Sequence, residues 1–179
     1  MTGCTCCDGL VHAPLGRRSL LRGAGLAAVW LAAGPRLGLA ASGHYEAMIL
    51  TCIDPRIQEP VHAYAVKQNL IGQYSQFVIA GAAIGAVAPK FPDWHKAFWD
   101  NLAVTVELHN IKKIIAIDHR DCGAAKLAYG DASVATPEVE TETHRKVMAE
   151  FRKQVHERQP ALGIETGLMA LDGSMVMFS

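Results

Sequence analysis

Apolar residues fall into two patterns along most of the chain: short continuous runs, and longer segments in which they recur at helical spacing. Short continuous runs are typical of parallel strands that are buried on both faces. Four segments show this pattern and are predicted to be strands: 48–53, 76–80, 113–118 and 162–171. The third of these runs continues directly into His119.

Helices are predicted in the segments between these strands. In residues 94–110, Asp93 is placed to cap a helix whose apolar face is formed by Trp94, Phe98, Leu102 and Thr105. Thr136 followed by Pro137 is the favoured order of cap and first-turn proline. The helix that starts there carries a stripe with a spacing of four residues: Val139, Thr143, Val147, Phe151 and Val155. Shorter helical segments are expected at 60–69 and 123–129.

An α/β fold follows from this alternation of strands and helices. We predict a central, mostly parallel sheet of four strands in the order 2-1-3-4, with an antiparallel edge strand and helices on both faces. The edge strand is expected at 175–178, because Asp172-Gly173 is a tight-turn signal that returns the chain beside the fourth strand.

The first 41 residues predict an export signal that precedes the domain at 42–179. The pair Arg17-Arg18 stands before an Ala-, Gly- and Leu-rich run at 23–34, and small residues follow at 38–42. A basic segment, a short apolar core and small residues at a cleavage point form a secretory signal, and paired arginines indicate the twin-arginine route of bacteria. The alternative, an amphipathic helix, is interrupted by glycine, proline and arginine. We therefore expect a periplasmic or otherwise extracytoplasmic protein.

Charge and composition narrow the function classes. Residues 1–40 contain four arginines and one aspartate, so the part that remains after processing has a net charge of about −3. It shows no basic stripe of the kind that nucleic-acid binding needs. No apolar run reaches the ~18 residues of a membrane span. We therefore expect a globular domain that binds no nucleic acid and does not span a membrane.

Three side chains suited to metal binding follow the first and third predicted strands. Cys52 closes the first strand, and His119 and Cys122 follow the third. If these strands are neighbours, the three side chains meet at the carboxyl edge of the sheet, where open parallel sheets bind ligands. Two thiolates and an imidazole are favoured zinc ligands, and three protein ligands leave a fourth position open, as in catalytic sites. The alternative is a Cys52–Cys122 disulfide, since the other three cysteines leave with the signal.

Together the two motifs resemble those of the β-class carbonic anhydrases. Cys52–Arg56 (Cys-Ile-Asp-Pro-Arg) matches the Cys-x-Asp-x-Arg that follows the first strand of that family. His119–Gly123 (His-Arg-Asp-Cys-Gly) matches its His-x-x-Cys, which is usually followed by glycine. The resemblance extends over residues 48–178 and implies the same α/β fold.

The resemblance also implies a role for each motif residue. Cys52, His119 and Cys122 would bind one zinc ion per chain, which lowers the pKa of a bound water to about 7 for attack on carbon dioxide. Asp54 and Arg56 would form the catalytic dyad, with Arg56 holding Asp54 away from the metal. Without that pairing, Asp54 could take the fourth metal position, as in the closed, inactive form known in the family. The alternative for Asp54 and Arg56 is an ordinary surface ion pair.

Three neighbouring residues have roles that the sequence leaves open. Gly123 could bring backbone N–H groups at a helix start near an anionic product, or could simply form a tight turn. Asp121 could orient a metal ligand through a hydrogen bond, or could cap the following helix. Asp118 is unusual, because the family more often has a small residue before this histidine.

Three features depart from the family pattern. Ala80–Ile84 stands where the family typically has Arg-Asn-Ala-Gly-Asn, so the polar wall of the site and the usual dimer contacts are altered. Tyr45 and Glu46 offer no counterpart to a substrate-binding glutamine that often precedes the first strand. Only a few residues separate the expected cleavage site from the first strand, which leaves little room for the family's N-terminal arm.

Four functions are compatible with these motifs. The first is zinc-dependent, reversible hydration of carbon dioxide to bicarbonate by a carbonic anhydrase-type lyase, as a homodimer or higher homo-oligomer. The second keeps the zinc chemistry but acts on a carbon dioxide analogue, carbonyl sulfide or carbon disulfide. The third is a zinc-binding protein without turnover, and the fourth is the metal-free disulfide form.

Overall fold

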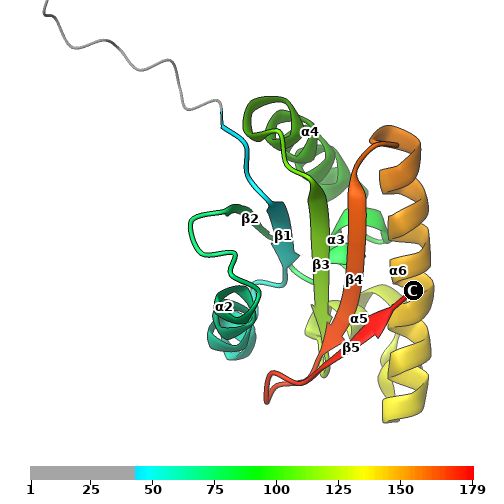
Figure 1. Cartoon of the computed structure of the whole chain (residues 1–179). Coiled ribbons are helices and arrows are strands. Elements are labelled where there is room, and N and C mark those ends of the chain that lie inside the picture. Colours follow the sequence, from blue (N-terminus) through cyan, green and yellow to red (C-terminus); the bar gives the residue numbers. More distant parts are fainter. Residues whose placement is uncertain (1–42) are drawn as a thin grey trace, which may run out of the picture. The chain divides into compact units, whose positions relative to one another are not determined.

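Five strands pair into one sheet in the computed structural model, which describes residues 43–179 (Figure 1). The strands are β1 (Ala47–Thr51), β2 (Tyr74–Val78), β3 (Lys113–His119), β4 (Gly163–Met169) and β5 (Met175–Phe178). Their order is β2-β1-β3-β4-β5, with every pair parallel except β4 and β5. The predicted strand order and the antiparallel edge strand are confirmed. The predicted signal at 1–41 lies outside the described residues.

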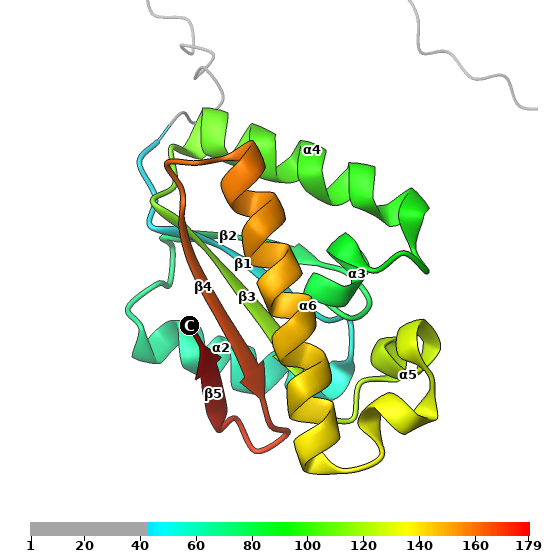
Figure 2. The same cartoon turned by 90° about the vertical axis from the view of Figure 1, so that its right-hand side faces the viewer.

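Helices cover both faces of the sheet, as predicted (Figures 1 and 2). The α-helices of the described part are α2 (Gln58–Lys67), α3 (Ala83–Val87), α4 (Pro92–His109), α5 (Gly123–Tyr129) and α6 (Pro137–Arg158). Helix α2 lies over one face, and α3, α4 and α6 pack on the other, against β3, β2 and β4 respectively. Within residues 43–179, no helix is both long and apolar enough to cross a lipid bilayer.

The core lies on both faces of the sheet, against α4 and α6 on one side and α2 on the other. Phe98 of α4 and Phe151 of α6 are fully buried, with ring centroids 5.7 Å apart, and Trp99 stacks on Phe151. All of β1 is buried, as is β3 from Ile114 onward. The two central strands are therefore held from both sides, which fixes the positions of the residues at their carboxyl ends.

The start of α4 differs from the prediction. The helix begins at Pro92, so Asp93 lies within its first turn, where its charge is favourable to the helix dipole. The capping position belongs to Phe91, whose side chain makes no capping bond. Proline at the first position explains the difference, because its fixed φ suits a helix start and it has no N–H that needs a cap.

The start of α6 is confirmed, but part of its predicted stripe is wrong. The hydroxyl of Thr136 accepts a hydrogen bond from the backbone N–H of Val139, as expected of a cap. Val139 itself is 42% exposed, and the buried face runs instead through Glu140 and His144 before reaching the predicted apolar residues. An apolar periodicity could not show this, because the buried residues of the first two turns are polar.

We expect Gly85 of α3 to be intolerant of alanine, although alanine usually favours a helix. A Cβ at Gly85 would lie 2.5 Å from the carbonyl oxygen of Ala80, which is backbone and cannot rotate away. The expected loss is about 1–3 kcal/mol of unfolding free energy, measured by urea denaturation. The matched control is Gly123→Ala, where a Cβ would meet no atom within 4 Å, so the change should stay within about 0.5 kcal/mol. Equal effects of the two substitutions would contradict the packing argument.

Candidate metal centre

The carboxyl ends of β1 and β3 bring three potential metal ligands together. The two strands are parallel neighbours, with Thr51 paired to Ile117, so Cys52 directly after β1 lies beside His119 at the end of β3. Cys122 follows one turn later as the N-cap residue of α5. One ligand atom from each of Cys52, His119 and Cys122 lies within 4.8 Å of the other two, and all three residues are buried. The predicted convergence of these side chains is confirmed.

His119 presents an unpaired nitrogen to this cluster. Its Nδ1 lies 2.9 Å from the carbonyl oxygen of Arg120, which can only accept, so Nδ1 carries the proton. Its Nε2 therefore carries a lone pair that could bind a metal. This atom is fully buried and has no hydrogen-bond partner. Buried polar atoms rarely stay unpaired in proteins. A metal ion would satisfy Nε2, and the donor set of two sulfurs and one nitrogen suits zinc.

The sulfur atoms of Cys52 and Cys122 lie within 4.8 Å of each other. Both are free, without a disulfide. The hydrogen bond from the Cys122 thiol lowers the pKa of Cys52 to about 4 against the effect of burial, helped by His119 and the N–H of Gly81. The same hydrogen bond, together with burial, raises the pKa of Cys122. A divalent cation bound between the two sulfurs would favour both thiolates.

Asp54 stands at the edge of the cluster and is held by Arg56. The guanidinium donates from Nε to Oδ1 at 3.0 Å and from Nη2 to Oδ2 at 2.7 Å, and the backbone N–H of Arg56 donates to Oδ1 at 2.9 Å. These hydrogen bonds lower the pKa of Asp54 to about 2. Oδ2 of Asp54 lies 4.0 Å from Nε2 of His119. The carboxylate is therefore adjacent to the cluster while its oxygens are engaged by Arg56.

Arg56 also joins the two loops that carry the ligands. Its Nη1 donates to Oδ2 of Asp121 at 2.8 Å, and its Nη2 donates to the backbone oxygen of Asp121 at 3.0 Å. Oδ1 of Asp121 contacts Lys126, and the N-cap position of α5 is occupied by Cys122. Asp121 therefore does not cap α5, and its side chain pairs with cations rather than with a ligand. A sequence motif cannot show this pairing, because 65 positions separate the two residues.

Two residues that support the site are not part of either sequence motif. Gln58 donates from Nε2 to the backbone oxygens of Cys52 and Asp54, at 3.1 and 2.9 Å, and so fixes the first loop. Glu140 of α6 accepts from the backbone N–H of Asp121 at 2.6 Å and from Arg120 at 3.0 Å, and so fixes the second loop. A glutamate near the start of a helix is common, because its charge is favourable to the helix dipole. The sequence therefore did not indicate that Glu140 also fixes the second loop.

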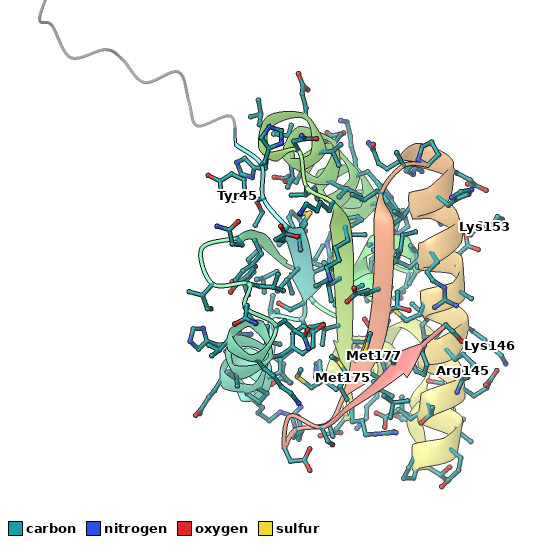
Figure 3. The ribbon with its side chains drawn as sticks, in the orientation of Figure 1. Tyr45, Arg145, Lys146, Lys153, Met175 and Met177 are labelled. Atoms are coloured by element: carbon teal, nitrogen blue, oxygen red, sulfur yellow. The ribbon has the colours of Figure 1, made fainter. Side chains whose placement is uncertain are left out.

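The segment that replaces the family's polar wall is apolar, and it consists of the turn before α3 and the first residues of that helix. Ala82, Ala83 and Ile84 are fully buried. The backbone N–H of Gly81 donates to Sγ of Cys52 at 3.1 Å, so the turn contacts the cluster through its main chain. Tyr45 lies before the first residue of β1, at the end of the strand opposite to the site (Figure 3). From this position it does not take the place of the family's substrate-binding glutamine.

Gly123 is the first residue of α5. A side chain there would meet no neighbouring atom, and its φ is not positive. Neither a tight turn nor crowding therefore requires glycine at this position. Its predicted contact with an anion stays a prediction.

Comparison with known proteins identifies the family. Residues 42–168 match the family described as "Putative carbonic anhydrase". The chain belongs to this family. Two uncharacterized relatives come from Rickettsia: one of Rickettsia bellii, 33% identical, covers 70% of this chain and 77% of its own length. The other, of Rickettsia conorii, is 32% identical and covers 70% of this chain and 68% of its own length.

Solved structures with the same fold are carbonic anhydrases of the β class. The carbonic anhydrase of Streptococcus mutans is 17% identical, with a TM-score of 0.51 over 93% of this chain and 100% of its own. A β-carbonic anhydrase of Trichomonas vaginalis is 18% identical, with a TM-score of 0.52 over 91% and 97%. The β-carbonic anhydrase CcaA is 14% identical, with a TM-score of 0.53 over 90% and 94%. The chain is thus a divergent, β-carbonic anhydrase-like member of its family.

Proposed function

We propose that the chain is a zinc-dependent carbonic anhydrase that interconverts carbon dioxide and bicarbonate. The observation that carries the proposal is the buried, unpaired Nε2 of His119 beside the two free thiols of Cys52 and Cys122. A zinc ion bound there would lower the pKa of a water ligand to about 7 and so supply a nucleophile near neutral pH. Membership of the carbonic anhydrase-like family supports this choice of metal and reaction.

The chain's own residues orient and confine the reaction. Asp54 can accept a hydrogen bond from the nucleophile and fix the direction of its lone pair, because its pKa of about 2 keeps it ionised. Arg56 holds that carboxylate in place and limits its approach to the metal. The turn at Gly81 places main chain beside Cys52, and the residues that follow it offer no polar side chain, which suits a small, uncharged linear substrate.

Stopped-flow measurement of carbon dioxide hydration tests the proposal directly. The zinc-loaded protein is assayed at pH ~8.5, where a water bound to catalytic zinc is ionised. We expect a kcat/KM of at least about 10⁴ M⁻¹ s⁻¹, the lower end of the usual enzyme range. Protein freed of zinc by a chelator is the matched control and should show only the buffer rate. A zinc-loaded sample that does no better than buffer would contradict the proposal and favour a zinc-binding protein without turnover.

A second substrate class is favoured by one observation. The segment Ala80–Ile84 offers no polar side chain where the family typically has an arginine and two asparagines. An apolar wall suits carbonyl sulfide or carbon disulfide at least as well as carbon dioxide. The same zinc-loaded sample can be assayed for sulfide release from both analogues. Sulfide release without carbon dioxide hydration would favour the analogue as substrate.

Thiol counting separates the metal site from the disulfide alternative. In a chain with Cys4, Cys6 and Cys7 changed to serine, only the two thiols of the site remain. The metal proposal expects two reactive thiols per chain after denaturation with a chelator and without a reductant. The disulfide form would give none.

The proposal also includes a location and an assembly. Export by the twin-arginine route is proposed from the N-terminal sequence alone. Self-association as a homodimer or higher homo-oligomer is proposed from the family resemblance alone.

A further inference from the structure

Asp118 is a buried carboxylate near the carboxyl end of the central strand β3. It precedes His119 on β3, on the sheet face that α3 and α6 cover, and it is 1% exposed. A buried carboxylate is costly unless it is paired and hydrogen-bonded. Its Oδ2 lies 2.7 Å from Nδ1 of His144 on α6, which is fully buried. Its Oδ1 accepts from the backbone N–H of Ala83 at 3.0 Å. One carboxylate thus connects β3, α6 and the start of α3.

The segment that Asp118 holds is a strained turn. Gly81 has a φ of +77° and Ala82 a φ of +49°, so two successive residues are in the left-handed half of backbone space. That region is unfavourable for alanine, and such strain persists only where the surroundings fix it. The turn is fixed on one side by the bond from Ala83 to Asp118. On the other side the N–H of Gly81 points at Sγ of Cys52.

We propose that Asp118 and His144 are positioning residues of the metal centre, which act by fixing the Gly81–Ala83 turn that donates a hydrogen bond to Cys52. The proposal rests on the proposed binding of a metal by Cys52, His119 and Cys122. Hydrogen bonds to a metal ligand fix its direction and tune its affinity for the metal. Here the donor is a backbone N–H whose orientation depends on a carboxylate on the neighbouring strand.

The unpaired atom of His144 argues against a purely stabilising role. Its Nε2 is buried and has no hydrogen-bond partner. An apolar pair of similar volume would avoid this unsatisfied atom and the cost of burying a carboxylate, and such replacements are often neutral or stabilising. We therefore assign the Asp118–His144 pair to positioning the turn rather than to stabilising the fold.

The test compares zinc affinity in two variants of the pair with a matched control. Asp118→Ala with His144→Leu removes both hydrogen bonds and keeps the total side-chain volume nearly constant. Asp118→Asn keeps the shape and can still accept from Ala83 and bond to Nδ1 of His144. The control is Thr166→Val, away from the metal ligands, which removes the bond that Arg152 of α6 donates to the Thr166 hydroxyl at 2.7 Å and the bond that this hydroxyl donates to Phe178 at 3.1 Å. Affinity is measured by competition with a zinc chelator, in the full chain with Cys4, Cys6 and Cys7 changed to serine.

We expect the double variant to bind zinc about 10–100-fold more weakly, with Asp118→Asn and Thr166→Val close to wild type. Two readouts do not depend on activity. Cobalt substituted for zinc should show a shifted sulfur-to-metal charge-transfer band in the double variant only. The amide proton of Gly81 should lose protection from hydrogen exchange in the same variant.

Each contrary result has a separate meaning. A double variant with wild-type zinc affinity, cobalt spectrum and Gly81 protection would overturn the positioning role. Weaker binding by Asp118→Asn equal to that of the double variant would overturn it as well, since charge rather than geometry would then matter. If the double variant does not fold, His144→Leu alone, which removes one of the two bonds that hold Asp118, carries the test: it should bind zinc more weakly and lose Gly81 protection, and wild-type values of both would overturn the proposal. A wild-type chain that binds neither zinc nor cobalt would instead refute the metal centre itself, and the positioning role with it.

Discussion

Replacing Cys122 by serine is expected to weaken zinc binding by at least about 100-fold. Structural zinc sites with four ligands have apparent binding free energies of about 10–16 kcal/mol, or about 3 kcal/mol per ligand. Within residues 43–179, Cys122 is one of three donor residues that converge here, so its loss removes a third of that donor set. The buried position adds to the effect, because water cannot easily reach Cys122 to replace the lost sulfur.

The measurement is the zinc content per chain after dialysis against chelators of graded affinity. The chain with Cys4, Cys6 and Cys7 changed to serine provides the matched control, since it loses three cysteines but none of the site. We expect about one zinc per chain in that control, and none in Cys122→Ser at the same chelator strength. Equal zinc retention by the two would mean that Cys122 is not a ligand.

Replacing Asp54 by asparagine is expected to lower kcat/KM for carbon dioxide hydration by about 10²–10⁴-fold, the usual contribution of a positioned proton-transfer group. Asparagine has nearly the same shape but presents an N–H₂ group, so it cannot reproduce a carboxylate that accepts on both oxygens. It also removes the charge that Arg56 pairs with at 2.7 Å. Asp54 is not among the three convergent ligands, so the zinc content should stay unchanged.

Stopped-flow kinetics and zinc analysis on the same sample separate the two effects. Asp100→Asn is the matched control, because Asp100 also pairs with a cation, Lys96, but is 60% exposed on α4. It should keep the wild-type rate and zinc content. A fully active, zinc-loaded Asp54→Asn variant would show that the Asp54–Arg56 pair is an ordinary ion pair at the edge of the site.

Apolar runs and turn signals were sufficient to predict the strand order. They missed helix α3, and the second strand lies at Tyr74–Val78, without buried residues, instead of at 76–80. The strands that carry Cys52 and His119 are buried on both faces, so their sequences are continuously apolar and stand out from the amphipathic helices. The ligand cluster was predictable for the same reason, since parallel neighbouring strands end at one edge of the sheet. The helix start at Thr136 and the turn at Asp172-Gly173 were also predictable, because each depends on residues that are neighbours in the sequence.

The support of the site depends on tertiary contacts and was not predictable. Asp118 looked like an anomaly, because its partner His144 lies 26 positions away on a helix whose expected stripe was apolar. Val139 seemed to belong to that stripe because Glu140, which is buried through its bonds to the second loop, carries no hydrophobic signal. From the sequence, Arg56 was expected to pair with Asp54. In the structure it also pairs with Asp121. Polar residues that are buried by pairing are invisible to a search for apolar periodicity.

The strand order has a consequence for how the protein is made. Because β1 sits between β2 and β3, Cys52 meets His119 only after the intervening chain has folded back. Closing so long a loop costs entropy before any contact compensates for it, and such parallel sheets form slowly. The anchors from α6, Glu140 and His144, come later still along the chain. A nascent polypeptide therefore cannot assemble the complete centre until nearly all of it has left the ribosome.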